Sequence, residues 1–558
     1  MAEVVFYPHN KSINVKEGTT ILEAARSAGV IIESPCNGAG TCGKCKVRLE
    51  REFLQNVLAK GKHCLLEEEE KLGYVLACEA QITGDIKVDL SENKQNTTLK
   101  ILSKGQSFDI SLRPLIKKEY FAYENMTRVF AGKKELGVEV GDTREENYGA
   151  VVDIGTTTLV VSLVNLNDGM EVGTSSTLNP QAVHAQDVLS RIKFSSDEEG
   201  LKIMYSELIH EINRMIGKIA VGAGVKRKNI YEIVFSGNTC MLHLASNANP
   251  AALGKYPYTP KINGSVYLNA LQHNIDISPF AVIYLPPIIS AYVGADIVSG
   301  VLASQLHKKE GITLFVDIGT NGEMVIASHG NLSATSTAAG PAFEGMNIAC
   351  GMRAGEGAIE FFEVEDQGSI NIKVIGETEA AGICGSGLLD IVGELVAHGV
   401  IKKNGQFIDP ESSNSLHPDL ARRLVKQDGK LIFKITDKVF LSQKDIRQVQ
   451  LAKGAIRAGI EFLLENKGVK ATDVDRVLIA GSFGYHLRGK SLINIGLLPK
   501  EFDGKIEFIG NTSLSGAKAF LLNETYRDGM KEVVKSVEVL ELANYKDFDK
   551  VFVKCLSF

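Results

Sequence analysis

Three cysteines crowd into a glycine-rich loop near the start of the chain, and a fourth follows at a distance. Cys36, Cys42 and Cys45 are spaced C-x5-C-x2-C, and Cys78 comes after 32 further residues. This spacing is close to that of plant-type [2Fe-2S] sites, with one residue more in the first gap. Glycines would let the loop curl around a cluster and turn backbone N–H groups toward its sulfides. The spacing therefore predicts a [2Fe-2S] cluster held by these four thiolates.

Zinc is the main alternative metal for this loop. Structural zinc sites usually pair two separated C-x2-C motifs, and Cys78 has no second cysteine two or four residues away, so iron–sulfur is favoured. Cys64 is an alternative fourth ligand, but it lies in a polar GKHC context before a run of glutamates. The remaining cysteines are expected to be small buried hydrophobic residues: Cys240, Cys350, Cys384 and Cys555.

An Asp-Ile-Gly-Thr motif occurs twice, 164 residues apart (317 − 153), in AVVDIGTTTLVVSLV at 150–164 and LFVDIGTNGEMVIAS at 314–328. In each copy an apolar strand ends at an aspartate, and the chain reverses through a glycine. Such a hairpin offers N–H groups and hydroxyls to phosphates, while the carboxylate holds hydrated Mg²⁺. One copy alone is also typical of a plain hairpin with a type I′ glycine. Two copies at this separation predict the two halves of a duplicated nucleotide clamp.

The predicted catalytic residues are Asp153 and Asp317, which would position Mg²⁺ and water. The predicted phosphate contacts are Gly155, Thr156, Thr157, Thr158, Gly319, Thr320, Asn321 and Gly322. A third motif suits the nucleoside end of a nucleotide, through Gly481, Ser482, Phe483 and Gly484. Its alternative interpretation is a tight turn between a strand and a helix.

Two weaker candidates complete the predicted site. Gly385 and Ser386 open an apolar helix whose N-terminal N–H groups would attract an anion, although a helix N-cap is the simpler role for Ser386. Gly340, in a glycine-rich stretch after the second hairpin, would border the γ-phosphate or only turn the chain. Core or surface roles are expected for the isolated histidines, among them His184, His243 and His486.

The elements around the cysteines are short strands and one helix. Thr19 or Thr20 would cap this helix and Gly29 would end it. Strands are predicted at 4–7, 12–16, 46–49, 74–82 and 85–90, which make a small mixed sheet that packs one helix.

The polarity and the hydrophobic pattern of the sequence change at two further points, near residues 93 and 149. Residues 93–148 are polar and charged, which predicts a linker without its own core. From 149 onward, apolar strands alternate with helical patterns, as in α/β proteins, and segment 232–244 resembles segment 476–487. The predicted domains are 1–92, a linker at 93–148, and an ATPase domain at 149–558 with lobes at about 149–310 and 311–558.

Composition excludes several classes of function. The chain has 558 residues, 44% of them hydrophobic, and 61 basic against 67 acidic residues give a net charge of −6. We therefore expect no nucleic-acid partner. The N-terminus lacks an export signal, and prolines and Asp296 interrupt the apolar window 281–302, so neither export nor membrane insertion is predicted and the expected location is the cytoplasm.

The cysteine segment resembles the ferredoxin β-grasp domain, with a C-x5-C-x2-C gap similar to the adrenodoxin branch, which implies a one-electron carrier. The repeated motifs resemble the actin, sugar kinase and heat-shock chaperone ATPase superfamily. That resemblance implies a phosphate-1 motif at 153–158, a phosphate-2 motif at 317–323 and an adenosine motif at 481–484.

The combination, with SGNTCMLHL, STAAGPAFEG, GICGSGLLD and IAGSFG in that order, resembles the reductive activators of corrinoid-dependent methyltransferases over nearly the whole chain. The resemblance implies ATP-dependent one-electron reduction of an inactive Co(II) corrinoid protein to Co(I) in anaerobic methyl transfer. It implies a [2Fe-2S] cluster, ATP and Mg²⁺ as cofactors, and a corrinoid protein and an upstream electron donor as partners. Monomer and homodimer both stay open. Some relatives carry an extra small domain, for which residues 93–148 leave little room.

Two other functions are weighed against this one. A phosphotransferase with a redox-sensing ferredoxin domain would need a base for its substrate, and the sequence assigns none. Dehydratase activators of the same superfamily are ATP-gated redox modules, but they hold a cluster between subunits on different cysteines.

Plant-type clusters have reduction potentials of about −400 mV, and Co(I) is a stronger reductant. Electron transfer from the cluster to Co(II) is therefore expected to be uphill, and ATP must supply the missing free energy.

Overall fold

The structure is a computed structural model, and it describes residues 1–8, 10–30, 32, 34, 38, 40, 43–58, 64–65, 67–91, 108–366, 368–409, 416–427, 429–481 and 487–558. The chain divides into two compact units. The first comprises residues 1–100, 180–191 and 341–449, and the second comprises 101–179, 192–340 and 450–558.

The N-terminal part of the first unit is a small mixed sheet that packs one helix, as predicted. Its strand order is β2-β1-β7-β3-β5, with β1 parallel to β7. Thr20 begins helix α1 through a capping box with Glu23, and the apolar face of α1 is buried. The predicted strand 74–82 is two strands joined by a turn that carries Cys78. The elements are β1 Ala2–Tyr7, β2 Lys11–Val15, α1 Ile21–Ser27, β3 Lys46–Leu49, β4 Val57–Leu58, α2 Glu67–Lys71, β5 Tyr74–Leu76, β6 Gln81–Ile82 and β7 Ile86–Asp89.

The later part of the first unit holds two three-stranded sheets and helix α7, which packs on strand β20. Its elements are β20 Ala358–Val364, β21 Ile370–Val374, β22 Gly382–Ile383, α7 Gly385–Ala397, α8 Pro418–Ala421, β23 Leu424–Gln427, β24 Lys430–Lys434 and β25 Phe440–Ser442. Two helices extend past the boundaries of this unit: α3 Val188–Phe194 and α9 Gln443–Lys467.

Two six-stranded sheets with the same central pattern form the second unit. Their orders are β13-β12-β11-β14-β16-β15 and β27-β26-β17-β18-β19-β28. Strand β11 pairs antiparallel with β12 and parallel with β14, and β17 pairs in the same way with β18 and β26. The predicted internal repeat is therefore confirmed. The strands are β11 Tyr148–Ile154, β12 Thr158–Asn165, β13 Glu171–Leu178, β14 Ile230–Gly237, β15 Val266–Asn269, β16 Val282–Leu285, β17 Ile312–Ile318, β18 Gly322–Ser328, β19 Asn331–Thr337, β26 Arg476–Ala480, β27 Ile506–Gly510 and β28 Glu538–Val539.

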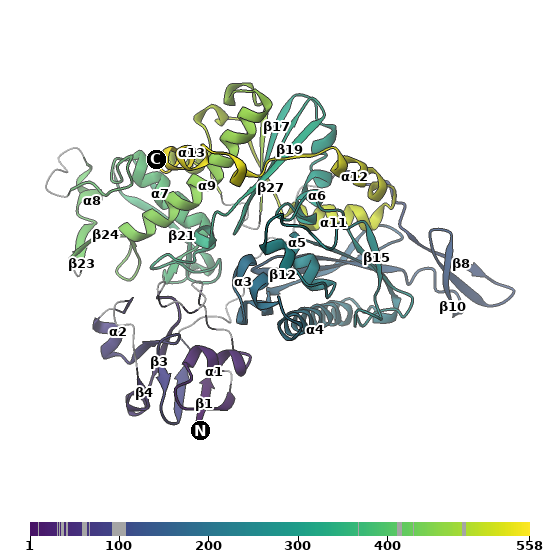
Figure 1. Cartoon of the computed structure of the whole chain (residues 1–558), viewed down its shortest axis with the longest axis horizontal. Helices are drawn as coiled ribbons and strands as arrows, with labels where there is room; N and C mark the ends of the chain where they lie inside the picture. Colours follow the sequence, from purple (N-terminus) through teal and green to yellow (C-terminus); the bar gives the residue numbers. More distant parts are fainter. Residues whose placement is uncertain are drawn as a thin grey trace. The chain divides into compact units, whose positions relative to one another are not determined.

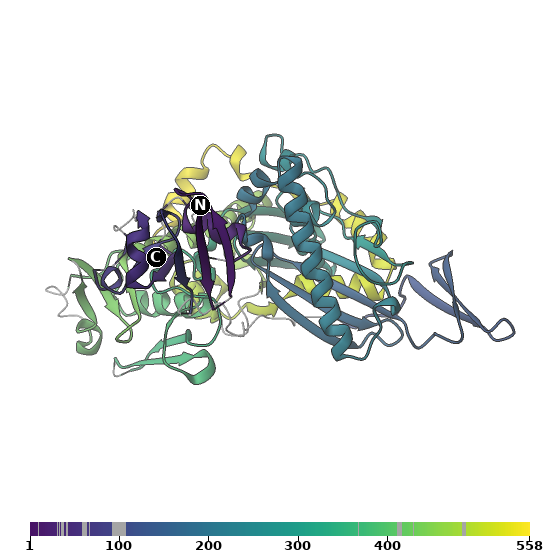
Figure 2. The same cartoon turned by 90° about the horizontal axis from the view of Figure 1, so that it is seen from below.

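Helices cover these sheets, and two of them join the halves. Helix α4 lies across β12 and β13 (Figure 2). Helices α6 and α11 pack against each other close to both sheets (Figure 1). Gly516 of α11 meets Ser299 of α6 so closely that a Cβ atom at 516 would collide with the Ser299 carbonyl. The helices are α4 Glu198–Gly222, α5 Thr239–Ala245, α6 Ala295–Ala303, α10 Gly489–Asn494, α11 Thr512–Leu522, α12 Thr525–Lys535 and α13 Phe548–Cys555.

A three-stranded antiparallel ribbon precedes the first six-stranded sheet and extends away from it (Figures 1 and 2). Its strands are β8 Ile116–Phe121, β9 Met126–Ala131 and β10 Lys134–Val140. The predicted linker at 93–148 therefore contains an ordered three-stranded sheet at 116–140, while residues 92–107 lie outside the described ones. The ribbon has no core of its own, as expected, because its buried Ile116 and Val129 belong to the same core as Val151 and Tyr231.

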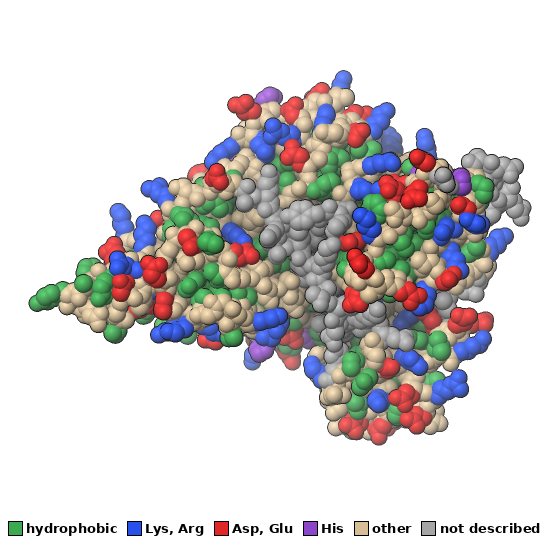
Figure 3. Space-filling view, turned by 180° about the vertical axis from the view of Figure 1, so that it is seen from behind, with side chains coloured by type: hydrophobic (Ala, Val, Ile, Leu, Met, Phe, Trp, Pro, Cys, Tyr) green, Lys and Arg blue, Asp and Glu red, His purple; other side chains and the backbone are tan. Residues whose placement is uncertain are grey.

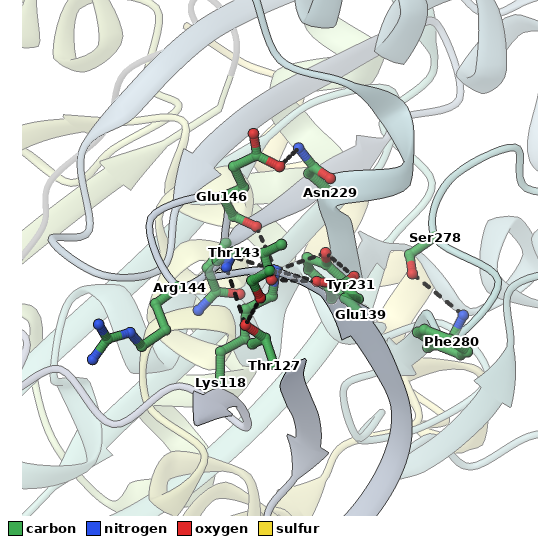
Figure 4. Close-up of polar contacts among 12 residues, drawn as sticks. Lys118, Thr127, Glu139, Thr143, Arg144, Glu146, Asn229, Tyr231, Ser278 and Phe280 are labelled. Carbon is green, nitrogen blue, oxygen red and sulfur yellow. Dashed lines mark hydrogen bonds and ion pairs between the residues drawn. The ribbon is translucent and has the colours of Figure 1, made fainter. Parts of the chain in front are cut away.

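Lys118 fastens the ribbon to strand β14 (Figure 4). Its side chain is 1% exposed, and its Nζ lies 2.9 Å from Glu139 Oε2 and 2.8 Å from the Tyr231 hydroxyl. The Glu146 carbonyl accepts a further hydrogen bond at 2.8 Å, and Tyr231 donates to Glu139 at 2.6 Å. Burial lowers the pKa of Lys118, against the opposing effect of Glu139.

No helix among the described residues is long and apolar enough to cross a membrane. The apolar window 281–302 instead contains strand β16 and most of helix α6. On the face that Figure 3 shows, Lys and Arg side chains are interspersed with Asp and Glu.

Candidate cluster loop and nucleotide site

The sequence places Cys45 just before strand β3 and Cys78 in the turn after β5, and the fold brings them together. Their Sγ atoms lie 3.2 Å apart, with Cys45 buried and Cys78 partly buried. Strands β3 and β5 are antiparallel neighbours, so their pairing positions the two thiols. The other two predicted ligands, Cys36 and Cys42, lie outside the described residues.

Glycines shape the loop between these cysteines, as expected. Gly38, Gly40 and Gly43 have φ values of 89°, 71° and 66°, in the left-handed region that other residues rarely adopt. A Cβ atom at Gly40 would also collide with the carboxylate of Glu79, next to Cys78. The loop therefore passes close against the turn that carries the fourth predicted ligand.

Cys64, the alternative fourth ligand, has a different environment. Its Sγ lies 3.6 Å from the Gly40 carbonyl, to which it donates. In the described part of the chain, no three His, Cys, Asp or Glu side chains gather as a metal site, so Cys64 does not join Cys45 and Cys78 in one. The geometry favours Cys78 as the fourth thiolate, and a thiolate set in a glycine-rich loop fits an iron–sulfur cluster.

In the second unit, Asp153 is the last residue but one of strand β11 and is held by residues from the other half of the repeat. Its Oδ1 accepts a hydrogen bond from Ser513 Oγ at 2.7 Å, and its Oδ2 accepts one from Asn511 Nδ2 at 2.8 Å. Asn511 also caps helix α11, because its Oδ1 accepts from the Leu514 N–H. Burial raises the pKa of Asp153, while the two hydrogen bonds oppose that rise.

Asp153 is one of four carboxyl groups in this part of the second unit; Asp153, Asp296 and Asp317 are half-buried and Glu323 is buried. Burial, and then the charge of Asp153, raises the pKa of Asp317 to about 7. Burial and the charges of Asp317 and Asp153 raise the pKa of Asp296, in the first turn of α6, to about 7. The pKa of Glu323, on β18, is raised by burial and by the charges of Asp296 and Asp317. No Lys or Arg forms an ion pair with these four groups among the described residues.

Four partly or fully buried carboxylates without a basic partner among the described residues suit a divalent cation with a high affinity for oxygen. Mg²⁺ is such a cation, and it usually keeps several of its waters when it binds to carboxylates in proteins. Sequence reasoning singled out Asp153 and Asp317 but missed the roles of Asp296 and Glu323. An aspartate that opens an otherwise apolar helix, ADIVSGVLA, was the available signal for Asp296.

The first phosphate hairpin is braced by two asparagines. Asn238, the N-cap of α5, donates to Thr156 Oγ1 at 3.1 Å, and Asn179 donates to the Gly155 carbonyl at 2.8 Å. The Asn179 N–H also donates to the carbonyl of Thr157. Neither Gly155 nor Gly319 of the second hairpin has a positive φ, so the turns are not the type I′ glycine turns of the alternative interpretation.

The third motif begins directly against the second hairpin. Gly481 has a φ of 122°, and a Cβ atom there would lie 2.6 Å from the Ile318 carbonyl and 3.2 Å from Asp317 Oδ1. Only glycine fits this approach. Thr320, Asn321 and Gly322 continue the hairpin into β18, whereas Ser482, Phe483 and Gly484 lie outside the described residues.

The weaker candidates have mixed outcomes. Gly340 has a φ of 77° and open space around its Cα, which suits a turn of the chain. The N-cap of α7 is Cys384 and not Ser386, whose hydroxyl donates to the Glu360 carbonyl at 2.9 Å, so the N-cap interpretation of Ser386 is wrong. An anion site at Gly385 and Ser386 stays a prediction. His243 is buried in the core, as expected.

Three family models match consecutive parts of the chain. Residues 5–83 match the 2Fe-2S iron-sulfur cluster binding domain, residues 148–309 match the RACo middle region, and residues 311–558 match the C-terminal domain of RACo, the ASKHA domain.

Similar proteins extend over most of the chain. It is 28% identical to the corrinoid activation enzyme RamQ of Eubacterium limosum, over 100% of this chain and 99% of that protein. It is 24% identical to the [Co(II) methylated amine-specific corrinoid protein] reductase of Methanosarcina barkeri, over 74% and 77%. A solved structure of the reductive activator for corrinoid,iron-sulfur protein is 30% identical, with a TM-score of 0.72 over 100% of this chain and 98% of that one.

Proposed function

The chain belongs to the family of reductive activators of corrinoid proteins, and from that premise we propose that it transfers one electron to a Co(II) corrinoid protein, in a step coupled to ATP, to give Co(I). One observation carries the proposal. The same chain holds a ferredoxin-type sheet with two of the predicted cluster cysteines 3.2 Å apart, and a duplicated pair of predicted phosphate hairpins with four carboxyl groups near them. The first supplies a redox centre and the second supplies a nucleotide site.

The residues divide into two groups by role. Cys36, Cys42, Cys45 and Cys78 would hold the cluster, which supplies one-electron redox chemistry when bound. An upstream donor would reduce it. The close approach of Gly40 to the carboxylate of Glu79 would keep this part of the loop near Cys78.

In the nucleotide site, Asp153 and Asp317 would hold hydrated Mg²⁺ and orient the attacking water. The two hairpins would bind the phosphates through their N–H groups and through hydroxyls such as that of Thr156. Asn511 and Ser513 would keep the carboxylate of Asp153 in one orientation through their hydrogen bonds, because no cationic side chain in the described part of the chain holds it.

Nucleotide binding would be coupled to the arrangement of the two halves of the repeat, because both halves contribute residues to the site. Asp153 belongs to the first half of the repeat, but the side chains that fix it belong to helix α11 of the second half. Phosphates bound on both hairpins would therefore favour one relative arrangement of the halves. We propose that this arrangement binds the Co(II) partner in a state that is easier to reduce, and that hydrolysis resets it.

The test follows cobalt directly. Full-length protein, prepared anaerobically with its cluster, is mixed with a purified Co(II) corrinoid protein, a reductant and Mg·ATP, and the Co(II) and Co(I) absorbance bands are recorded. Asp317→Asn should abolish ATP-dependent Co(I) formation and leave the cluster spectrum intact. The matched control is Asp549→Asn, at an exposed position on α13. Unchanged cobalt reduction in Asp317→Asn would refute the coupling.

A further inference from the structure

A surface loop of the second unit, residues 254–263, gathers exposed aromatic and basic side chains; we call it the tyrosine loop. Tyr256 is 78% exposed, and its ring lies 6.0 Å from that of Tyr258 in an edge-on contact. Lys255 and Lys261 are exposed, and among the described residues neither forms an ion pair. No Asp or Glu occurs between 251 and 275, so the loop is positive in a chain whose net charge is −6.

The backbone of the tyrosine loop is strained at its centre. Tyr258 has a φ of 56°, in the left-handed region that a bulky residue rarely occupies. Such a conformation persists only when its surroundings impose it, and it is found often at binding and switch sites. Around Tyr258, two series of contacts connect the tyrosine loop to the nucleotide site.

The first connection passes through His243. The Thr239 carbonyl lies 2.7 Å from His243 Nδ1 and can only accept, so Nδ1 carries the proton. Nε2 is then the acceptor for the Lys261 N–H of the tyrosine loop at 2.9 Å. Thr239 begins α5, whose N-cap Asn238 donates to Thr156 in the first phosphate hairpin. One helix of seven residues thus links the loop to a predicted phosphate contact.

The second connection passes through Tyr292. Its ring lies 5.5 Å from that of Tyr258, and its hydroxyl donates to the Leu253 carbonyl at 2.7 Å. The segment continues to Gly294, where a Cβ atom would lie 2.5 Å from Asn238 Cα, and then to Asp296 of the carboxylate group. The loop therefore contacts segments that lead to both Thr156 and Asp296.

We propose that the tyrosine loop is the surface on which the corrinoid-carrying protein docks, and that occupancy of the phosphate hairpins sets its conformation. The proposal rests on the proposed function, which supplies the partner. Tyrosine is enriched in the centres of protein interfaces, because its ring buries a large area while its hydroxyl keeps a polar contact. The two lysines call for an acidic surface around an apolar recess that takes the Tyr256 ring.

A second copy of this chain fits the loop less well. A two-fold interface centred on the loop would bring the same pair of lysines from both copies together, and segment 251–275 has no Asp or Glu to compensate them. A different, acidic protein meets the charge requirement.

The docking test measures the affinity of the full-length holoprotein for a Co(II) corrinoid protein in the presence of Mg²⁺ and a non-hydrolysable ATP analogue. Tyr256→Ser should weaken binding by about tenfold or more, as for a central interface residue. Lys255→Glu with Lys261→Glu should weaken binding further and reduce its salt dependence. Matched controls on the ribbon are Tyr123→Ser, at a fully exposed residue, and Lys133→Glu with Lys134→Glu; neither should change the affinity more than twofold.

The coupling test uses the absence of tryptophan from this chain. Tyr256→Trp introduces a single fluorophore into the loop, and Tyr123→Trp introduces one into the ribbon. Nucleotide with Mg²⁺ should shift the emission of the first variant and leave the second unchanged. No shift at 256 would overturn the coupling.

The outcomes separate the two proposals. If the loop variants bind the partner as tightly as the controls do, docking at this loop is wrong, even when wild-type protein reduces cobalt. If loop variants lose self-association but keep their affinity for the partner, a second copy is the occupant and the proposal is overturned. If wild-type protein forms no Co(I), the proposed function itself fails, whatever the loop variants show.

Discussion

At the scale of single residues, two groups of side chains are proposed to do the chemistry: the cluster cysteines and the carboxyl groups near the phosphate hairpins. Cys45 and Cys78 have their sulfurs 3.2 Å apart, while Cys64 stays with the Gly40 carbonyl. The carboxyl groups near Asp153 have no cationic partner among the described residues. In both groups, ionisable side chains lie close together and away from full contact with water. Their ionised forms are therefore unfavourable unless a bound metal centre compensates the charge.

The cysteine geometry makes a direct prediction. Cys78→Ser should lose the cluster or shift its visible absorption and EPR signals, because a serine hydroxyl is a poor substitute for a thiolate ligand of iron. Cys64→Ser should keep the iron and sulfide content and the spectrum of the wild-type protein. Chemical analysis and EPR of the dithionite-reduced proteins measure both. The opposite pattern would make Cys64 the fourth ligand.

Site residues could be predicted from the sequence where they lie close together in the chain. They could not be predicted where folding brings distant segments together. The cysteine spacing and the two Asp-Ile-Gly-Thr motifs are local signals, and the structure places Asp153 and Asp317 at corresponding strand ends. Asp296 and Asn511 lie more than 140 residues from Asp153 in the chain. Only the packing of α6 and α11 brings them to it.

At the scale of elements, the ribbon β8–β10 shows how a polar sequence forms ordered structure. Alternating exposed positions with few apolar residues resemble a linker, and Ile116 and Val129 are the only fully buried apolar side chains of its three strands. What holds the ribbon is a polar network around Lys118, whose partners come from as far along the chain as Tyr231. A pattern of hydrophobic residues cannot reveal such an anchor.

The anchor is testable. Lys118→Met should lower the free energy of unfolding by about 3 kcal/mol, since it leaves Glu139 partly buried and without its cation. Lys117→Met, one residue earlier and exposed on the same strand, should change it by less than about 0.5 kcal/mol. Urea unfolding measures both, and limited proteolysis should cut the ribbon faster in Lys118→Met. The double variant Lys118→Met with Glu139→Leu should recover most of the loss; equal stability of both single variants would show that the network contributes nothing.

At the scale of the whole molecule, duplication organises the fold. Two sheets with the same central order, each with an aspartate at the end of its middle strand, were predictable because the repeat is written in the sequence. The grouping of residues 1–100, 180–191 and 341–449 into one compact unit was not, because nothing local marks three separate stretches as neighbours.

The four carboxyl groups near the phosphate hairpins, of Asp153, Asp296, Asp317 and Glu323, should make the stability of the whole molecule depend on pH. Asp296 and Asp317 have pKa values of about 7 in the folded protein, above their values near 4 in the unfolded chain. The folded state therefore holds more protons than the unfolded state across this range, and stability must fall as pH rises from about 4 through 7. We choose the window from pH 6.5 to 8, because buried His243, whose pKa is lowered by burial, acts in the opposite direction below it.

In EDTA, the melting temperature should therefore fall between pH 6.5 and 8, by about 1 °C for each kcal/mol lost, because the entropy of unfolding scales with the length of the chain. Mg²⁺ with nucleotide should remove or reverse this slope, because it binds the deprotonated groups. Asp296→Asn should have a shallower slope than the wild-type protein and Asp549→Asn the same slope. Calorimetry at four pH values measures it, and an unchanged slope in Asp296→Asn would show that this group does not set the pH dependence.

The crossing of α6 and α11 has a consequence for how such proteins diverge. Because Gly516 meets the main chain of Ser299 directly, no side-chain rotation can absorb a misfit between the two halves. A lineage that replaced this glycine would need a compensating change in the opposite helix, so we expect the two helices to change together in evolution. Chimaeras that join the first half of one relative to the second half of another should then assemble only when this pair comes from a single parent.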